Sequence, residues 1–190
     1  MSLLRRTEGS TAAEFALVLP LLLLFLIGII DVGRLMWTWN RAEKATQMGV
    51  RYAVVTAMVP STLASRDFAL ADSIPGGNPV PSASFSSTTC DNANCTGSWG
   101  YDSTEFANIV SRMRMFYPEL AATNITVKYE NIGLGYAGDP NGPDVSPLVT
   151  VQLQGMSFTP IVFNLFRSSI TLPPFSAALT MEDGSGSVSN

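Results

Sequence analysis

An unbroken apolar run, FALVLPLLLLFLIGII, extends from Phe15 to Ile30 and constrains this chain more than any other feature. The run contains no charge and no side-chain amide, and Glu14 comes directly before it. As a helix, at about 1.5 Å per residue, it is about 24 Å long, slightly less than the ~30 Å hydrocarbon core of a bilayer. Adding Ser10–Ala13 gives a stretch, 10–30, that is long enough to span with one charge in it. We therefore predict a transmembrane helix.

Two other interpretations of the run fit less well. A cleaved secretory signal has a basic start, which MSLLRR provides, but it should end in a small-x-small cleavage site. The sequence after Ile30 is DVGRLMWTW, which contains no such site. A helix in the core of a soluble domain is also disfavoured, because the run is apolar on every face rather than along one stripe.

Charge and composition exclude several classes of function. Residues 1–60 contain six Lys/Arg and four Asp/Glu, a net charge of +2, and residues 61–190 contain five and eleven, a net charge of −6, which together give −4. The acidic, Ser/Thr-rich part lacks the basic face that binds nucleic acid. The chain has no histidine, and we find no nucleophile elbow, phosphate-binding glycine loop or helical metal-ligand pair. We predict no enzymatic activity, no cofactor, no metal centre and no nucleic-acid partner.

The two cysteines, Cys90 and Cys95, lie in the polar sequence CDNANC. Two thiols alone cannot form a structural zinc site, and redox pairs usually have two intervening residues rather than four. We favour a local disulfide over a free or redox-active pair. A disulfide implies an oxidising compartment such as the periplasm or the cell exterior. Basic residues lie on both sides of the apolar run, so the positive-inside rule does not fix its orientation, and the cysteines favour the C-terminal part outside.

A glycine stands five residues before Glu14. If the chain were cut after Gly9, Ser10 would carry the new amino terminus and Glu14 would be the fifth residue of the mature protein, followed by Phe15. This arrangement resembles the processing site of type IV prepilins. The new α-amino group can neutralise the Glu14 carboxylate of a neighbouring helix, so that a charge otherwise costly in hydrocarbon becomes paired and sets the axial register between subunits.

The longer segment RRTEGSTAAEFALVLPLLLLFLIGIIDVGRLMWTWNRAEKATQMGVRYA, residues 5–53, resembles the TadE-like segment of tight-adherence (Tad, type IVc) pilus systems. The matching elements are the small residues before Glu14, the ALVLPLLLL sequence with Pro20, the GIIDVGRL sequence and the Ala/Gly-rich continuation. Asp31 is a variant, because the family often has glutamate there. An anonymous single-span anchor is the alternative interpretation of the segment.

The resemblance implies a minor pilin or pseudopilin, since major subunits of this pilus class are much shorter chains. Its partners would be a prepilin peptidase, other major and minor pilins, the inner-membrane assembly platform and membrane lipid. Its location would be the bacterial inner membrane, with one span and a periplasmic C-terminal domain, and after assembly the pilus at the cell surface. Its role would be in pilus assembly, adhesion and biofilm formation. The alternative function is a permanently anchored periplasmic binding or adhesin module that does not polymerise.

The helix should continue well beyond the apolar run. No proline interrupts residues 31–59, and Pro60 then stops the pattern. Trp37 and Trp39 could lie in an aromatic belt at the membrane surface or in packing contacts. Small residues recur every four positions and predict close helix packing: Ala45, Gly49, Ala53 and Ala57. We expect a leader (1–9), a transmembrane and polymerisation helix (10–31) and an amphipathic helix (32–60).

The remaining sequence predicts an α+β head. Residues 61–101 are expected to be a Ser/Pro/Gly-rich loop, 102–183 the head and 184–190 a flexible tail. A second helix should begin at a capping pair, Asp102 and Glu105. Its apolar face and the strand positions that alternate with polar residues are these: Phe106, Ile109, Val110, Met113 and Tyr117, then 125–130, 149–154 and 175–181. Together with the long helix they predict a small, mainly antiparallel sheet in a pilin-like arrangement.

Between two of these strands lies the turn-rich sequence GDPNGPD. Asp139, Asn141 and Asp144 could bind Ca²⁺, but the sequence lacks the spacing and the terminal glutamate of an EF-hand. A plain turn is the favoured interpretation.

Overall fold

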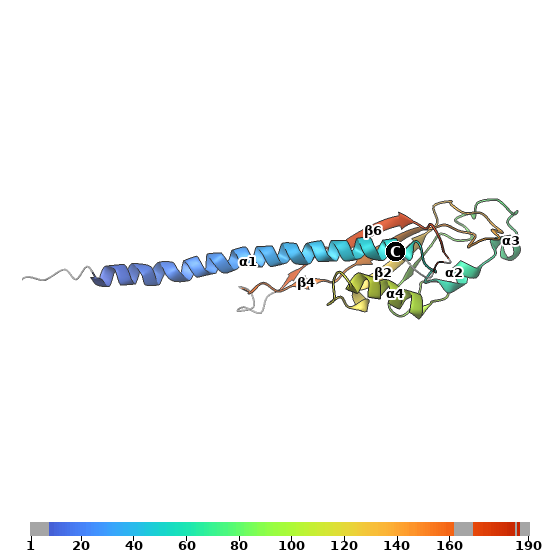
Figure 1. Ribbon diagram of the computed structural model, residues 1–190. Helices are drawn as coiled ribbons and strands as arrows, with labels where there is room; N and C mark the ends of the chain where they lie inside the picture. Colours follow the sequence, from blue (N-terminus) through green and yellow to red (C-terminus); the bar gives the residue numbers. More distant parts are fainter. Residues whose placement is uncertain (1–7, 162–168, 185, 187–190) are drawn as a thin grey trace, which may run out of the picture. The chain divides into compact units, whose positions relative to one another are not determined.

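The computed structural model describes residues 8–161, 169–184 and 186, and its chain forms two compact units (Figure 1). The first comprises residues 1–39 and 157–171, and the second comprises residues 40–156 and 172–190. The predicted leader, 1–9, lies almost entirely outside the described residues. The same is true of most of the segment 159–166, for which the sequence predicts a short helical or loop crossing.

The first unit contains most of the long helix α1, Glu8–Ala53, and a two-stranded hairpin. The hairpin strands are β4, Ser157–Phe158, and β5, Ile170–Thr171, which pair antiparallel with Phe158 opposite Ile170. The sequence did not predict these strands, because two residues are too short for an alternating pattern.

The second unit is built on a four-stranded antiparallel sheet in the order β1-β2-β3-β6. The strands are β1 Ser87–Cys90, β2 Ile125–Glu130, β3 Leu148–Leu153 and β6 Phe175–Thr180. In β2 and β3 every second side chain is buried, as the alternation predicted. The α+β class is therefore confirmed.

The helix α4, Ser103–Arg114, packs four residues of its predicted apolar face into the core of this unit, Phe106, Ile109, Val110 and Met113, whereas Tyr117 is buried beyond the end of the helix. Asp102 caps it by accepting hydrogen bonds from the backbone N–H groups of Thr104 and Glu105. The Asp102 N–H donates to the Val59 carbonyl, so the capping relation with Glu105 is not reciprocal. Figure 1 shows α4 and the C-terminal part of α1 beside the strands.

The end of α1 differs from its prediction, since the helix ends at Ala53 and not near residue 59. A longer helix would need the Val54 carbonyl to accept a bond from within the helix, but it accepts the N–H groups of Glu182 and Asp183 instead. The N–H of Ala57 donates to Gly186. Chain from the far end of the sequence thus replaces the helical bonds.

The expected loop at 61–101 also contains regular structure. It holds α2, Ser61–Ser65, α3, Phe68–Ala71, and the edge strand β1. In β1, Thr88 and Cys90 are buried, and the strand pairs with β2. The Ser/Thr composition concealed this strand, whose partner lies about 40 residues further along the chain.

The last strand, β6, is an edge strand that pairs only with β3 among the described strands. Phe175 and Met181 are buried at its two ends, as expected of its apolar face, whereas Leu179 is 41% exposed. The predicted apolar face is therefore covered only in part.

Candidate membrane and assembly segment

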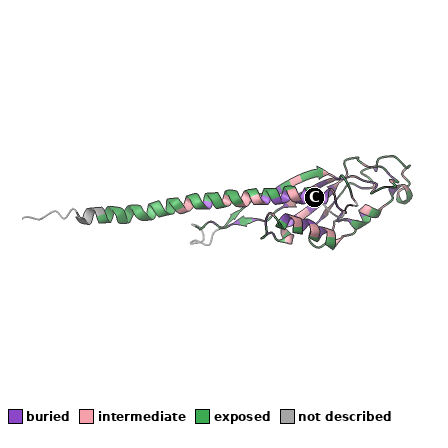
Figure 2. Ribbon diagram, viewed as in Figure 1, coloured by how far each residue is buried: buried purple, intermediate pink, exposed green. Residues whose placement is uncertain are grey.

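The N-terminal part of α1 exposes large apolar side chains on every face (Figure 2). The residues 12–26 are all exposed, with Phe15 at 65% and Leu17 at 73%. The most apolar window of this helix has a mean hydropathy of 2.8, and only 6% of it is buried. Among the described residues, α1 is the one helix long and apolar enough to cross a membrane, and it can serve as a membrane anchor.

The predicted processing residues lie in the first turns of α1. The described part of α1 begins at Glu8, so Gly9 and Ser10 are helical and lie next to that start. Glycine lowers helix stability relative to alanine, so the helix is weakened locally at Gly9. Glu14 lies one turn further along the helix and is exposed. Its carboxylate therefore faces the lipid or protein that surrounds the apolar segment.

Asp31 ends the apolar run and is 93% buried, being only 7% exposed. Its Oδ1 accepts a hydrogen bond of 2.8 Å from the backbone N–H of Ile161 and one of 2.9 Å from Nη1 of Arg34. The Arg34 guanidinium also lies 5.3 Å from the centre of the Phe158 ring. One carboxylate thus ties α1 to the hairpin.

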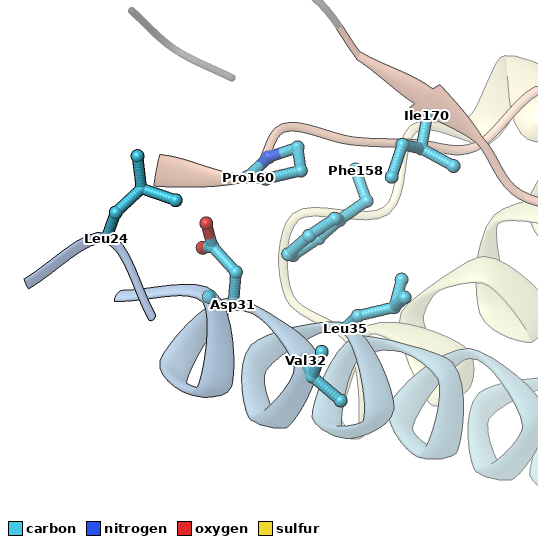
Figure 3. Close-up of a pocket in the computed structure, with 8 residues that line it drawn as sticks. Leu24, Asp31, Val32, Leu35, Phe158, Pro160 and Ile170 are labelled. Carbon is cyan, nitrogen blue, oxygen red and sulfur yellow. The ribbon is translucent and has the colours of Figure 1, made fainter. Parts of the chain in front are cut away.

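Beside Asp31, α1 and the hairpin line an open apolar pocket of about 270 Å³ (Figure 3). Figure 3 shows the Asp31 carboxylate pointing from the helix toward Pro160. The pocket is lined by these residues: Leu24, Gly28, Asp31, Val32, Leu35, Phe158, Pro160 and Ile170. Sequence reasoning noted Asp31 only as a variant of the pattern. A buried carboxylate at the end of an apolar run was the available signal, but its partner is 130 residues away.

The small residues of the predicted packing stripe lie in the second unit. Ala45 and Ala53 are fully buried. At Gly49 an added Cβ would lie 2.7 Å from Cγ of Met113 and 3.4 Å from Cγ1 of Val151, so the helix backbone approaches both α4 and β3 there. Ala57 lies beyond the end of α1 and does not belong to this helix stripe.

Arg41 ties the same part of α1 to the segment that follows α4. Its Nη2 lies 2.8 Å from the Glu119 carboxylate, its Nε donates to the Phe116 carbonyl, and its guanidinium lies 4.7 Å from the centre of the Tyr117 ring. Burial is the main cause that raises the pKa of the Tyr117 hydroxyl. Trp37, four residues earlier, is 67% exposed, whereas Trp39 is half-buried.

Cys90 and Cys95 form the predicted disulfide, with their Cα atoms 3.9 Å apart. Between them, Asp91 accepts hydrogen bonds from the N–H groups of Asn94 and Ala93, and these bonds hold the pKa of its carboxyl below the usual value. The six-residue loop is therefore held by a covalent bond and by one side chain.

The acidic residues of the GDPNGPD turn organise the backbone around them. Asp144 is buried, and its two oxygens accept the N–H groups of Phe68, at 2.6 Å, and Asp139, at 3.0 Å. Asp139 in turn accepts the N–H of Asn141. Among residues 8–161, 169–184 and 186, no group of three or more His, Cys, Asp or Glu is placed to hold a metal ion.

Comparison with known proteins found a family match for the N-terminal segment. No curated protein and no solved structure matches the chain. The model of one family, described as TadE-like protein, matches residues 9–51. The match contains Gly9, Glu14, Asp31 and Gly49, and it covers both the exposed apolar part of α1 and most of the buried part. The resemblance predicted from the sequence is thereby confirmed, and residues 9–51 of this chain are a TadE-like segment.

Proposed function

We propose that this protein is a minor pilin, or pseudopilin, of a Tad (type IVc) pilus. The observation that carries the proposal is that the TadE-like match, 9–51, coincides with a helix that is apolar and exposed at one end and buried in a folded domain at the other. An exposed apolar helix must be covered by lipid or by other helices. A pilin uses both in turn, first as a membrane protein and then as a filament subunit.

The proposed cycle begins with insertion in the inner membrane, with the second unit on the periplasmic side. The Cys90–Cys95 disulfide supports that side, because such bonds persist in oxidising compartments. A prepilin peptidase then cuts after Gly9, within the first turn of α1. The assembly platform brings the mature chain together with other pilins, and the resulting pilus serves adhesion and biofilm formation.

Within the filament, Glu14 acts as the register residue. It is exposed on α1 beside Phe15, in a part of the helix that has no room for water once other helices surround it. A carboxylate there costs several kcal/mol unless an opposite charge pairs with it. The α-amino group that cleavage creates at Ser10 of a neighbouring subunit is the partner. The role of the protein is then structural, without catalysis.

The N-terminal mass of the membrane-extracted protein tests the proposal. A mature chain that begins at Ser10 is expected, and it should cross-link to other pilins in sheared pili. An intact leader on a chain that never enters pili would favour instead a permanently anchored binding module.

A further inference from the structure

We infer that the β4–β5 hairpin is a second contact with the membrane, and that the pocket between it and α1 takes part of a phospholipid acyl chain. The inference rests on the membrane placement of α1 in the proposed function. Every contact that supports it lies within the first compact unit.

The pocket reaches below the end of the apolar run. The pocket is lined from Leu35 down to Leu24 on the helix side and by Phe158, Pro160 and Ile170 on the hairpin side. Leu24 stands six residues inside the apolar run that ends at Ile30, which is about 9 Å along a helix axis. Interfacial elements bury their apolar faces ~5–10 Å into the headgroup and acyl boundary. If the run lies in lipid, the hairpin beside Leu24 lies in that boundary.

The hairpin surface carries exposed apolar side chains. Ile161 is 46% exposed and Ile170 is 39% exposed. In water these side chains would widen an apolar surface that α1 already makes large, whereas at the membrane boundary they face the same acyl chains as Ile30 of the helix, which is 54% exposed. Lipid therefore accounts for the exposed side chains on both elements.

The backbone next to β4 has a hydrogen-bond acceptor on α1. A strand hairpin in an apolar environment is costly where its N–H groups lack acceptors. The Ile161 N–H has an acceptor, the Oδ1 of Asp31, at 2.8 Å. The carboxylate is itself charge-paired with Arg34, which lies one turn further along α1 and whose side chain is 48% exposed. Arg34 can thus reach the polar headgroups while Asp31 stays buried, because a long arginine side chain next to an apolar run can extend its charged end toward water.

The size and the opening of the pocket favour an acyl chain as its occupant. The pocket is about 270 Å³ and opens to the surface, and Asp31 is the one polar side chain among its lining residues. It can take part of an extended acyl chain, whereas a neighbouring helix could place only a single side chain in it. Its wall is continuous with the apolar run, so a chain in the bilayer reaches it without leaving hydrocarbon.

The experiment places a fluorophore at the hairpin of the full-length protein. Ile161→Cys is labelled with a thiol-specific, polarity-sensitive dye, and Cys90 and Cys95 do not react because they form a disulfide. The protein is reconstituted into phosphatidylcholine vesicles that carry a quencher on the acyl chain near the headgroup. Ile132→Cys is the matched control, because this isoleucine of the second unit is 45% exposed against 46% for Ile161.

The expected result is a several-fold stronger quenching of the dye at position 161 than at 132, with blue-shifted emission, at a protein-to-lipid ratio that keeps chains apart. Equal, weak quenching in protein that floats with the vesicles overturns the inference. A blue shift that appears only when chains are crowded also overturns it, and assigns the pocket to a second copy. Protein that fails to float, or that keeps its leader in cells, counts against the proposed function instead.

A second pair of variants tests the carboxylate in the labelled protein. Asp31→Asn keeps an oxygen acceptor for the Ile161 N–H, and Asp31→Leu removes it while keeping the same number of side-chain heavy atoms, branched at Cγ. Quenching at position 161 should persist in the first variant and fall in the second. Equal quenching in both would overturn the assignment of Asp31 as the residue that holds the hairpin at this depth.

Discussion

The two ends of α1 belong to one helix but carry opposite surfaces. Toward the N-terminus the side chains are large and exposed, as at Phe15 and Leu17, and toward the C-terminus they are small and buried, as at Ala45 and Ala53. Large aliphatic side chains gain most from hydrocarbon around the helix, whereas alanine and glycine let another backbone approach closely. Side-chain size along one continuous helix therefore distinguishes the exposed apolar part, which can serve as a membrane anchor, from the part that belongs to a folded domain.

We expect the largest effect from blocking cleavage after Gly9 at the exposed N-terminal end of α1. A peptidase must bind an extended backbone around the cut, and a β-branched side chain at position 9 would crowd it. We expect Gly9→Val to leave a full-length, membrane-retained chain, seen by mass or gel mobility. Ala12→Val, which places the same valine side chain beyond the cut, is the control and should mature normally. Maturation of Gly9→Val to a chain that begins at Ser10 would sink the processing model.

Glu14→Ala should separate insertion from assembly. Insertion depends on the summed apolar transfer of Phe15–Ile30, and removal of one edge charge can only ease it. In the proposed filament the substitution leaves the Ser10 amino group of a neighbouring subunit without its partner charge, at a cost of roughly 3–5 kcal/mol. The variant should be inserted and cut normally but recovered poorly in sheared pili, and Glu14→Asp should be intermediate. Wild-type recovery of Glu14→Ala would leave Glu14 without a register role.

The same substitution at two glycines of α1 compares the two ends directly. Gly49→Val must displace Met113 and press on Val151, whereas at Gly33 no atom lies within 4 Å of an added Cβ. Overpacking of a formed core costs about 1–3 kcal/mol. Urea unfolding of the detergent-solubilised protein, followed by signals of the second unit, should show that loss for Gly49→Val and none for Gly33→Val. Equal losses would mean that the two ends do not differ in packing.

Local patterns predicted much of this fold, because each depends on neighbours in sequence. The alternation in 125–130 and 149–154, the apolar face of α4 and the short Cys90–Cys95 loop are of this kind. The features that were missed depend on distant partners. The chain at the end of α1 is hydrogen-bonded to Glu182, Asp183 and Gly186, and Asp31 accepts a hydrogen bond from Ile161. No window of sequence contains both members of those pairs.

The candidate site divides in the same way. Glu14 and Gly9 are recognisable because a fixed spacing relates them to the apolar run. Asp31 has equally clear chemistry, but a carboxylate at the end of a run is ambiguous until its acceptor role for a hairpin N–H is seen. The sequence therefore indicated the residues that we propose to act on other proteins, and it missed Asp31, whose contacts lie within its own chain.

The smallest expected effect is that of the disulfide, and it tests the side of the membrane on which the second unit lies. The bond closes a loop of six residues, for which the chain-entropy model gives at most about 2 kcal/mol. Asp91 holds the same loop through the N–H groups of Ala93 and Asn94, and β1 remains paired with β2. Replacing Cys90 and Cys95 together by serine should therefore loosen residues 85–100, seen as faster amide exchange there, and leave the sheet folded. Thiol labelling of the native protein completes the test: an unreactive pair agrees with an oxidising compartment, and two reactive thiols in intact cells would overturn the periplasmic placement while leaving the packing contrast along α1 intact.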